Sequence, residues 1–199
     1  MKRLINIRGA VATGKTTAVR EFCQHYGFSV EEVDAKRIRF PVSVLDGRKI
    51  VVLGDYKNNK KVTGLDNLRN KEKKFLCKAD IKEMIFEVNK IYNPEVIIYE
   101  RMLSSLTFKG TKEIADYSAV FGYEYLGVQL FCSEKTREFL LYKRSGVLAK
   151  KKNFYGRGKI VDRATEMLND NGYFVWRKNV ENIDEKDMWR IVDEALRSS

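Results

Sequence analysis

The segment from Gly9 to Thr16 constrains the fold of this chain more than any other. Its sequence, Gly-Ala-Val-Ala-Thr-Gly-Lys-Thr, matches the phosphate-loop (Walker A) pattern G-x-x-x-x-G-K-[ST] at every fixed position. The apolar run 4–7 before it predicts a buried strand, and apolar residues at 18, 19, 22 and 23 recur at helical spacing after it. Strand, glycine loop and helix therefore follow one another in the order that a phosphate-binding loop requires.

This loop predicts the binding of a nucleoside triphosphate, ATP, with Mg²⁺. The backbone N–H groups of the loop and the positive end of the helix dipole favour an anion there. We expect Lys15 to reach the β- and γ-phosphates and the Thr16 hydroxyl to ligate Mg²⁺. The predicted cofactor-binding residues are Gly9, Ala10, Val11, Ala12, Thr13, Gly14, Lys15, Thr16 and Thr17.

Length and composition favour one globular domain over 1–199 in the cytoplasm. The chain has 199 residues and 44% hydrophobic content, enough for a substantial core. It has no run of about 18 apolar residues and no signal segment, so we expect neither a membrane span nor secretion. Its three cysteines lie far apart, and we expect reduced thiols. The net charge of +11 favours a polyanionic partner, although mononucleotide enzymes also carry many basic residues.

The run 95–101 predicts a second part of the same site. An apolar strand there ends in Glu100 and Arg101, and the carboxyl ends of parallel strands line the ligand-binding edge of a sheet. We expect Glu100 to face Mg²⁺ or an acceptor hydroxyl, and Arg101 to reach a phosphate or hold the acceptor. The alternative is an exposed Glu-Arg pair after a buried strand.

Further acceptor-side candidates precede that strand. Asp34 and Arg37 follow a predicted second strand, and either they hold the acceptor or Asp34 only caps a turn. Asp-Gly between two β-prone runs predicts a hairpin over 38–54, inserted over the substrate side. Tyr56 is a candidate to stack on a base, and Asp66 either caps the next helix or acts as a base. One amphipathic helix is predicted over 67–92.

The most basic segment, 143–163, predicts a mobile lid that closes on the transferring phosphoryl group. Arg144, Arg157 and Arg163 are the candidates to stabilise its charge, and Phe154 or Tyr155 to stack on a base. The alternative is a disordered basic loop. The whole pattern predicts a three-layer α/β fold of the P-loop NTPase type, with a five-stranded, mainly parallel sheet, a β-hairpin insertion and a basic lid.

These motifs resemble the P-loop kinases of nucleosides and nucleotides. Deoxynucleoside kinases carry Glu-Arg-Ser after the strand that corresponds to 95–101, with the glutamate as base; here Met102 follows Glu100-Arg101, and Ser104 lies two residues further on. The pair Asp34 and Arg37 is similar to the Asp-x-x-Arg of polynucleotide 5′-kinases.

The chain also resembles a group of small bacteriophage P-loop kinases. They combine the loop and a hairpin with a Gly-x-Tyr…Gly-x-Asp segment, here Gly54-Asp55-Tyr56 and Gly64-Leu65-Asp66, and Thr63 stands where the group has a further glycine. Some of them are 5-hydroxymethyluracil DNA kinases. The resemblance implies an ATP-dependent kinase of the hydroxymethyl group in phage DNA.

Three alternatives stay open at this point. The acceptor could be a free deoxynucleoside or deoxynucleotide, or the 5′-hydroxyl of a polynucleotide. A non-catalytic, ATP-dependent nucleic-acid-binding switch is the third.

Overall fold

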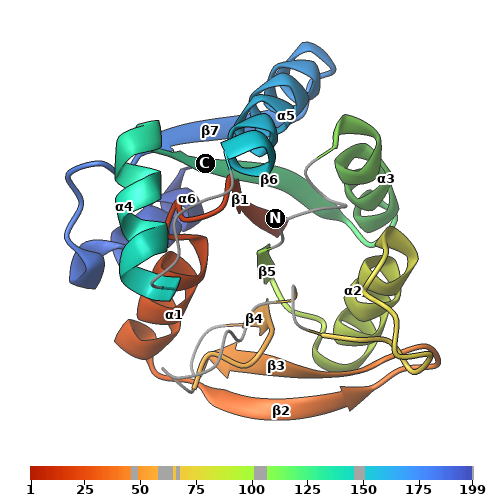
Figure 1. Cartoon of the computed structure of the whole chain (residues 1–199). Coiled ribbons are helices and arrows are strands. Elements are labelled where there is room, and N and C mark those ends of the chain that lie inside the picture. The colour runs from red at the N-terminus through yellow and green to blue at the C-terminus, as the bar shows by residue number, and fades with distance from the viewer. Residues whose placement is uncertain (46–48, 58–64, 66–67, 101–106, 146–150, 199) are drawn as a thin grey trace.

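The computed structural model describes residues 1–45, 49–57, 65, 68–100, 107–145 and 151–198, and the side chains of 144–157 are not among the described ones. Figure 1 shows the chain from the edge at which the parallel strands end. In chain order the elements are β1 (Lys2–Gly9), α1 (Lys15–Tyr26), β2 (Ser29–Asp34), β3 (Arg39–Leu45), β4 (Ile50–Leu53), α2 (Lys78–Tyr92), β5 (Val96–Glu100), α3 (Phe108–Ala119), β6 (Tyr123–Phe131), α4 (Glu134–Ser145), α5 (Lys151–Asp170), β7 (Phe174–Asn179), the short 3₁₀ helix η2 (Glu185–Asp187) and α6 (Trp189–Arg197).

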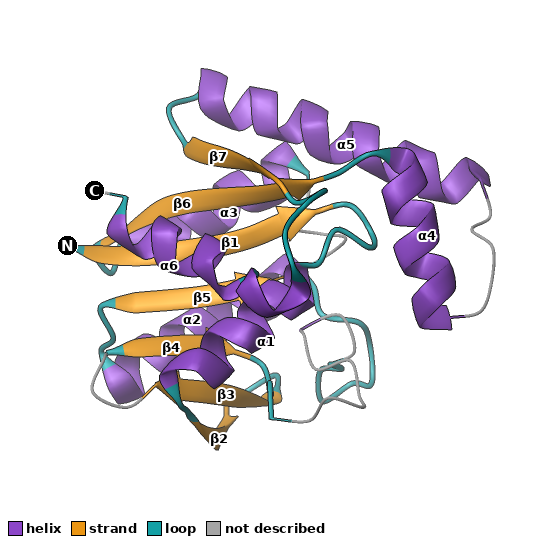
Figure 2. Cartoon of the chain, turned by 90° about the vertical axis from the view of Figure 1, so that its left-hand side faces the viewer, coloured by secondary structure: helices purple, strands orange, loops and turns teal. Residues whose placement is uncertain are grey.

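The predicted α/β fold with a mainly parallel sheet is confirmed. Seven strands form one sheet in the order β2-β3-β4-β5-β1-β6-β7. The five strands from β4 to β7 in that order are parallel, β3 pairs antiparallel with β4, and β2 pairs antiparallel with β3. The sheet therefore has two strands more than the five expected. Figure 2 shows the strands side by side, with β1 near the middle.

The predicted hairpin forms, but it belongs to the main sheet. β3 and β4 pair antiparallel, and β4 also pairs parallel to β5 through Ile50, Val51 and Val52. All four residues of β4 are buried, which is typical of a strand covered on both faces. The hairpin therefore extends the main sheet, because an apolar strand of this kind is most stable inside it, and its place over the substrate side stays a prediction.

Helices cover both faces of the sheet and make three layers. The side chains of β1 alternate: Ile5 and Ile7 pack in the core under α1 and α6, and Leu4 packs in the core under α2 and α3. α5 joins the second face through Val161, Ala164 and Leu168, as Figure 1 also shows. Among the described residues, no helix is long and apolar enough to cross a membrane.

The helix predicted over 67–92 begins only at Lys78. Before it, the Asn70 side chain accepts hydrogen bonds from the backbone N–H groups of Glu72 and Lys74, which holds this stretch in a turn. Asp80 then accepts from the Cys77 N–H at 2.7 Å and so caps the first turn of α2.

The basic segment 143–163 is more helical than the predicted mobile arm. α4 continues to Ser145, and α5 starts at Lys151, eight residues after the basic segment begins. Lys and Arg are good helix formers, and the buried spacing of Val161, Ala164 and Leu168 fixes α5 on the sheet.

Candidate active site

Two glycines shape the loop between β1 and α1. Gly9 has φ +149° and Gly14 has φ +79°, both in the region that side chains disfavour. A Cβ on Gly9 would lie 2.6 Å from the Leu130 carbonyl oxygen, and one on Gly14 would lie 2.7 Å from Cε of Met188. The backbone of Leu130 leaves no room for a side chain at Gly9, and the positive φ of Gly14 disfavours one there, so the loop conformation depends on both glycines.

The start of α1 is suited to an anion. Its own first turn contains no acidic residue, so the helix itself places no carboxylate at the positive end of its dipole. Lys15 is only 6% exposed, and its Nζ donates to the Ala10 carbonyl oxygen at 2.9 Å. The lysine thus lies across the loop, where it adds a cation to the backbone donors.

Thr16, Glu100 and Tyr56 meet at one carboxylate. The Thr16 hydroxyl donates to Oε2 of Glu100 at 3.0 Å, and the Tyr56 hydroxyl donates to Oε1 at 3.3 Å. Glu100 is 4% exposed and Tyr56 is fully buried. The structure therefore joins the phosphate loop, the end of β5 and the segment after β4, three parts of the chain that are far apart in sequence.

This arrangement fits Mg²⁺. The ion takes oxygen ligands, keeps several waters and is commonly held by one or two carboxylates together with substrate phosphates. The hydroxyl of Thr16 and the carboxylate of Glu100 are oxygen ligands of the kind that Mg²⁺ takes, and they meet beside the loop; their assignment as metal ligands stays a prediction. No group of three or more His, Cys, Asp or Glu suited to a metal occurs among the described residues.

Arg137 is a site residue that the sequence did not reveal. Its Nε donates to the Val11 carbonyl oxygen of the loop at 3.2 Å, and the residue is 5% exposed. It also lines a small cavity of about 60 Å³ together with Ala10, Thr13 and Gln129. The only sequence signal was indirect: Arg137 lies in the first turns of the helix after β6, and β6 is the strand beside β1.

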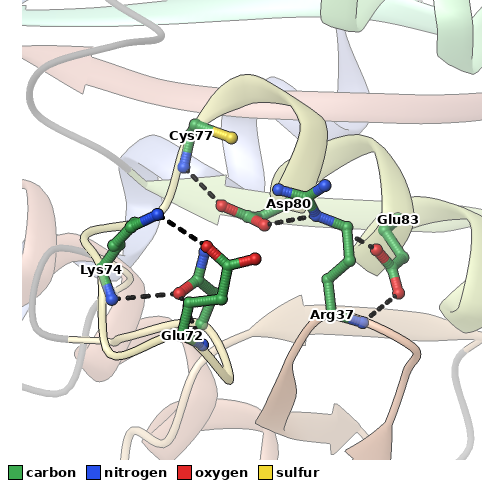
Figure 3. Close-up of polar contacts among 7 residues, drawn as sticks. Arg37, Glu72, Lys74, Cys77, Asp80 and Glu83 are labelled. Atoms are coloured by element: carbon green, nitrogen blue, oxygen red, sulfur yellow. Dashed lines mark hydrogen bonds and ion pairs between the residues drawn. The ribbon is translucent and has the colours of Figure 1, made fainter.

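Asp34 and Arg37 bind the start of α2 and the turn before it. Asp34 lies 2.8 Å from Nζ of Lys71, and this lysine lowers the pKa of the Asp34 carboxyl. Nε of Arg37 lies 3.1 Å from the buried Asp80 and 3.9 Å from Glu83, as Figure 3 shows. Asp34 and Arg37 thus both form ion pairs that connect parts of the fold. The assignment of these two residues as acceptor-binding residues stays a prediction.

The Asp80 carboxylate is the buried centre of this cluster. Burial raises the pKa of Asp80, but hydrogen bonds from Cys77 and Arg37 outweigh it, so the pKa lies below its usual value. Figure 3 shows the Lys74–Glu72 pair beside it, at 2.8 Å. Asp80 therefore joins the β2–β3 connection to α2.

The remaining predicted residues divide into three groups. Tyr56 is fully buried and bonded to Glu100, and its stacking on a base stays a prediction. Arg163 is exposed on α5. Asp66 and Arg101 lie outside the described residues, and so do the side chains of Arg144, Phe154, Tyr155 and Arg157.

Comparison with known proteins gives structural likenesses only. No family model matches the sequence, and no curated protein sequence matches it. A gluconokinase from Sinorhizobium meliloti 1021 aligns with a TM-score of 0.48 and 11% identity, covering 98% of this chain and 91% of its own. Deoxyadenosine kinase from M. mycoides with bound dCTP gives 0.42 and 14%, covering 98% and 100%. The same enzyme with bound dATP gives 0.41 and 16%, covering 100% of both chains.

Proposed function

We propose that this protein is an ATP-dependent kinase that transfers the γ-phosphoryl group to a hydroxyl. The observation that carries the proposal is the contact of Thr16 with Glu100 beside Lys15. Phosphoryl transfer needs little covalent chemistry from the protein, because catalysis is mainly positioning and neutralisation of charge. Lys15 and the N–H groups of the loop would hold the phosphates, and Thr16 and Glu100 would hold Mg²⁺, which supplies charge neutralisation when bound.

The described part of the site suits transfer rather than binding alone. Glu100 is held from two sides by hydroxyl groups, so the carboxylate is fixed before a ligand arrives. Arg137 lies against the loop and adds a buried cation near the phosphates. A fixed carboxylate and a fixed cation are the preorganised charges that stabilise a transferring phosphoryl group.

The proposed acceptor is the hydroxymethyl group of 5-hydroxymethyluracil in phage DNA. Its support is the resemblance of the Gly54–Tyr56 and Gly64–Asp66 segments to phage kinases, together with the net charge of +11. The contact of Tyr56 with Glu100 gives the first of these segments a role in the site. A base in a duplex would first have to be unstacked, at a cost of a few kcal/mol.

Asp66 is the proposed base, and Arg144, Arg157 and Arg163 are the proposed lid cations. Asp55 is a second candidate for the base, because it lies two residues after β4, at the strand end beside Glu100. If Asp66→Asn keeps full activity while Asp55→Asn loses it, the base is Asp55.

The test is incubation with γ-labelled ATP and a panel of acceptors. The panel holds plain DNA, 5-hydroxymethyluracil DNA, 5′-hydroxyl DNA, and free deoxynucleosides and their monophosphates. We expect label on 5-hydroxymethyluracil DNA, and none with Lys15→Ala. Label on a free deoxynucleoside or a 5′-end would move the assignment to the other acceptor classes, and no label on any acceptor would leave the nucleic-acid-binding switch.

A further inference from the structure

An exposed aromatic ring lies on a basic turn ahead of α2. Residues 69–75, called here the 69–75 turn, begin and end in an antiparallel bridge between Arg69 and Phe75. The guanidinium carbon of Arg69 lies 3.4 Å from the centre of the Phe75 ring. Phe75 nevertheless stays 68% exposed. The arginine thus covers one side of the ring, and much of the ring remains open to solvent.

The turn is held rigidly from within and from its neighbour. The backbone N–H of Asn70 donates to the Lys74 carbonyl at 3.0 Å, and that of Lys73 donates to the Asn70 carbonyl at 2.8 Å. The backbone N–H of Lys71 donates to the Arg37 carbonyl at 2.8 Å, which ties the turn to the β2–β3 connection. Because the ring is already ordered, a ligand that stacks on it pays little further conformational entropy.

The charge around Phe75 is positive. Between Arg69 and Phe75 the sequence has three lysines and one acid, Glu72. Lys71 pairs with Asp34 and Lys74 with Glu72. Lys73, exposed and at φ +60°, has no ion pair among the described residues. The turn therefore offers a cation to a phosphate beside an open aromatic face.

The turn lies at the same edge of the sheet as the candidate active site. β4 is parallel to β5, and β3 and β2 alternate in direction from it. The end of β2 and the start of β3 thus lie at the edge where Glu100 ends β5. In Figure 1 the start of α2 lies on the side opposite α1 and α4, and α4 is the helix whose Arg137 contacts the phosphate loop. The turn is thus away from the nucleotide side.

We propose that the 69–75 turn binds single-stranded nucleic acid, with a base stacked on Phe75 and flanking phosphates at Lys73 and the neighbouring cations. Aromatic rings flanked by basic side chains are the means by which proteins hold unpaired strands. Bases inside a duplex stack on one another and offer no face to Phe75. A second copy of the chain would bring a further net charge of +11 to this surface, which opposes self-association. The inference rests on the proposed function in one respect: the bound nucleic-acid strand would carry the hydroxyl that accepts the phosphoryl group.

Direct binding tests the inference without ATP. The probe is a fluorescein-labelled oligothymidylate, measured by fluorescence anisotropy with the full chain, and a blunt duplex of equal length serves as comparison. We expect Phe75→Ala to weaken binding of the single strand by about 5- to 100-fold. Phe75→Trp should restore binding, whereas Phe75→Leu, which keeps an apolar side chain without a ring, should not.

Phe174→Ala is the matched control. Phe174 is 62% exposed and opens β7, at the amino end of the strands and thus at the opposite edge of the sheet. Its variant should bind like the wild type. Lys73→Gln should make the slope of log K against log salt shallower by about 0.7, the contribution of one phosphate contact to a single strand.

Several results would overturn the inference. Binding by Phe75→Ala within about twofold of the wild type would do so, as would an equal loss in Phe174→Ala or equal Phe75-dependent binding of the duplex. A Phe75→Ala protein that binds normally but elutes as a smaller species would identify a contact between copies. Failure of the kinase proposal would give a different result. If no acceptor is labelled but Phe75-dependent binding of the single strand is intact, the kinase proposal is rejected and nucleic-acid binding by the 69–75 turn is retained.

Discussion

Replacement of Glu100 by glutamine tests the centre of the proposed active site. The carboxylate is 4% exposed and accepts hydrogen bonds from Thr16 and Tyr56 at 3.0 and 3.3 Å. Glutamine has almost the same shape and keeps one oxygen acceptor. The substitution therefore removes the negative charge while leaving the packing of β5 in place.

The expected effect on catalysis is larger than the effect on stability. Replacement of hydrogen bonds to a carboxylate by hydrogen bonds to an amide should change the free energy of unfolding by about 1–2 kcal/mol. Loss of a charged metal ligand should lower kcat by about 10²-fold or more, which corresponds to about 2.7 kcal/mol of activation free energy. Because the lost interaction is with Mg²⁺, a high Mg²⁺ concentration should restore part of the rate.

The assay is initial rate against Mg²⁺ concentration, on the acceptor that the labelled panel identifies. Glu95→Gln is the matched control, because Glu95 directly precedes the same strand, at its opposite end, and its side chain is 68% exposed. We expect wild-type rates for Glu95→Gln. A Glu100→Gln enzyme with kcat within about threefold of the wild type at every Mg²⁺ concentration would refute the role of Glu100 as a metal ligand or base.

Three further predictions follow from the loop and from buried ionisable groups. Lys15→Ala should abolish label transfer and leave the circular dichroism spectrum unchanged, because the Nζ of Lys15 donates to a carbonyl oxygen of the loop and the residue belongs to neither apolar core. The pKa of Asp80 is lowered in the folded protein, so the ionised carboxylate stabilises the fold above the unfolded pKa of about 4, and this stabilisation is lost as pH falls through the folded value. In urea unfolding, Asp80→Asn should therefore be about 1–3 kcal/mol less stable than the wild type at pH 7 and nearly equal to it near pH 2. Burial raises the pKa of Cys23 to about 12, so a thiol reagent at pH 8 should label Cys23 only after unfolding and the two half-buried cysteines before it.

The phosphate loop could be predicted because its information is local. Gly9, Gly14, Lys15 and Thr16 occupy fixed positions in one short segment, and the flanking strand and helix follow directly. The position of Glu100 beside the loop was also predictable, since a strand of the apolar pattern 96–99 ends there. In both cases one stretch of chain determines the geometry.

The pairing of distant segments could not be predicted in the same way. Tyr56 reaches Glu100, and Arg137 reaches Val11, only because β4, β5, β1 and β6 are neighbours in the sheet. Sheet order depends on contacts between strands that no local pattern encodes. A tyrosine after a strand therefore suggested a stacking ring, whereas the fold buries it.

The start of α2 was misplaced for a more local reason. Apolar spacing continues back to Leu68, but Lys73 takes φ +60° and the Asn70 side chain bonds to two backbone N–H groups. Cysteine at position 77 is not a usual N-cap residue, so the capping carboxylate of Asp80 was the only signal of the true start.

The pair of strands β2 and β3 protects β4 from other molecules. Without them, the buried, fully apolar run Ile50–Leu53 would be the outer strand of the sheet, with unpaired backbone groups open to another chain. β2, which takes that outer place, carries Glu31, Glu32 and Asp34. Charges on an outer strand discourage edge-to-edge pairing between molecules. A shortened chain that lacks 29–45 would consequently be expected to aggregate instead of giving a smaller working domain.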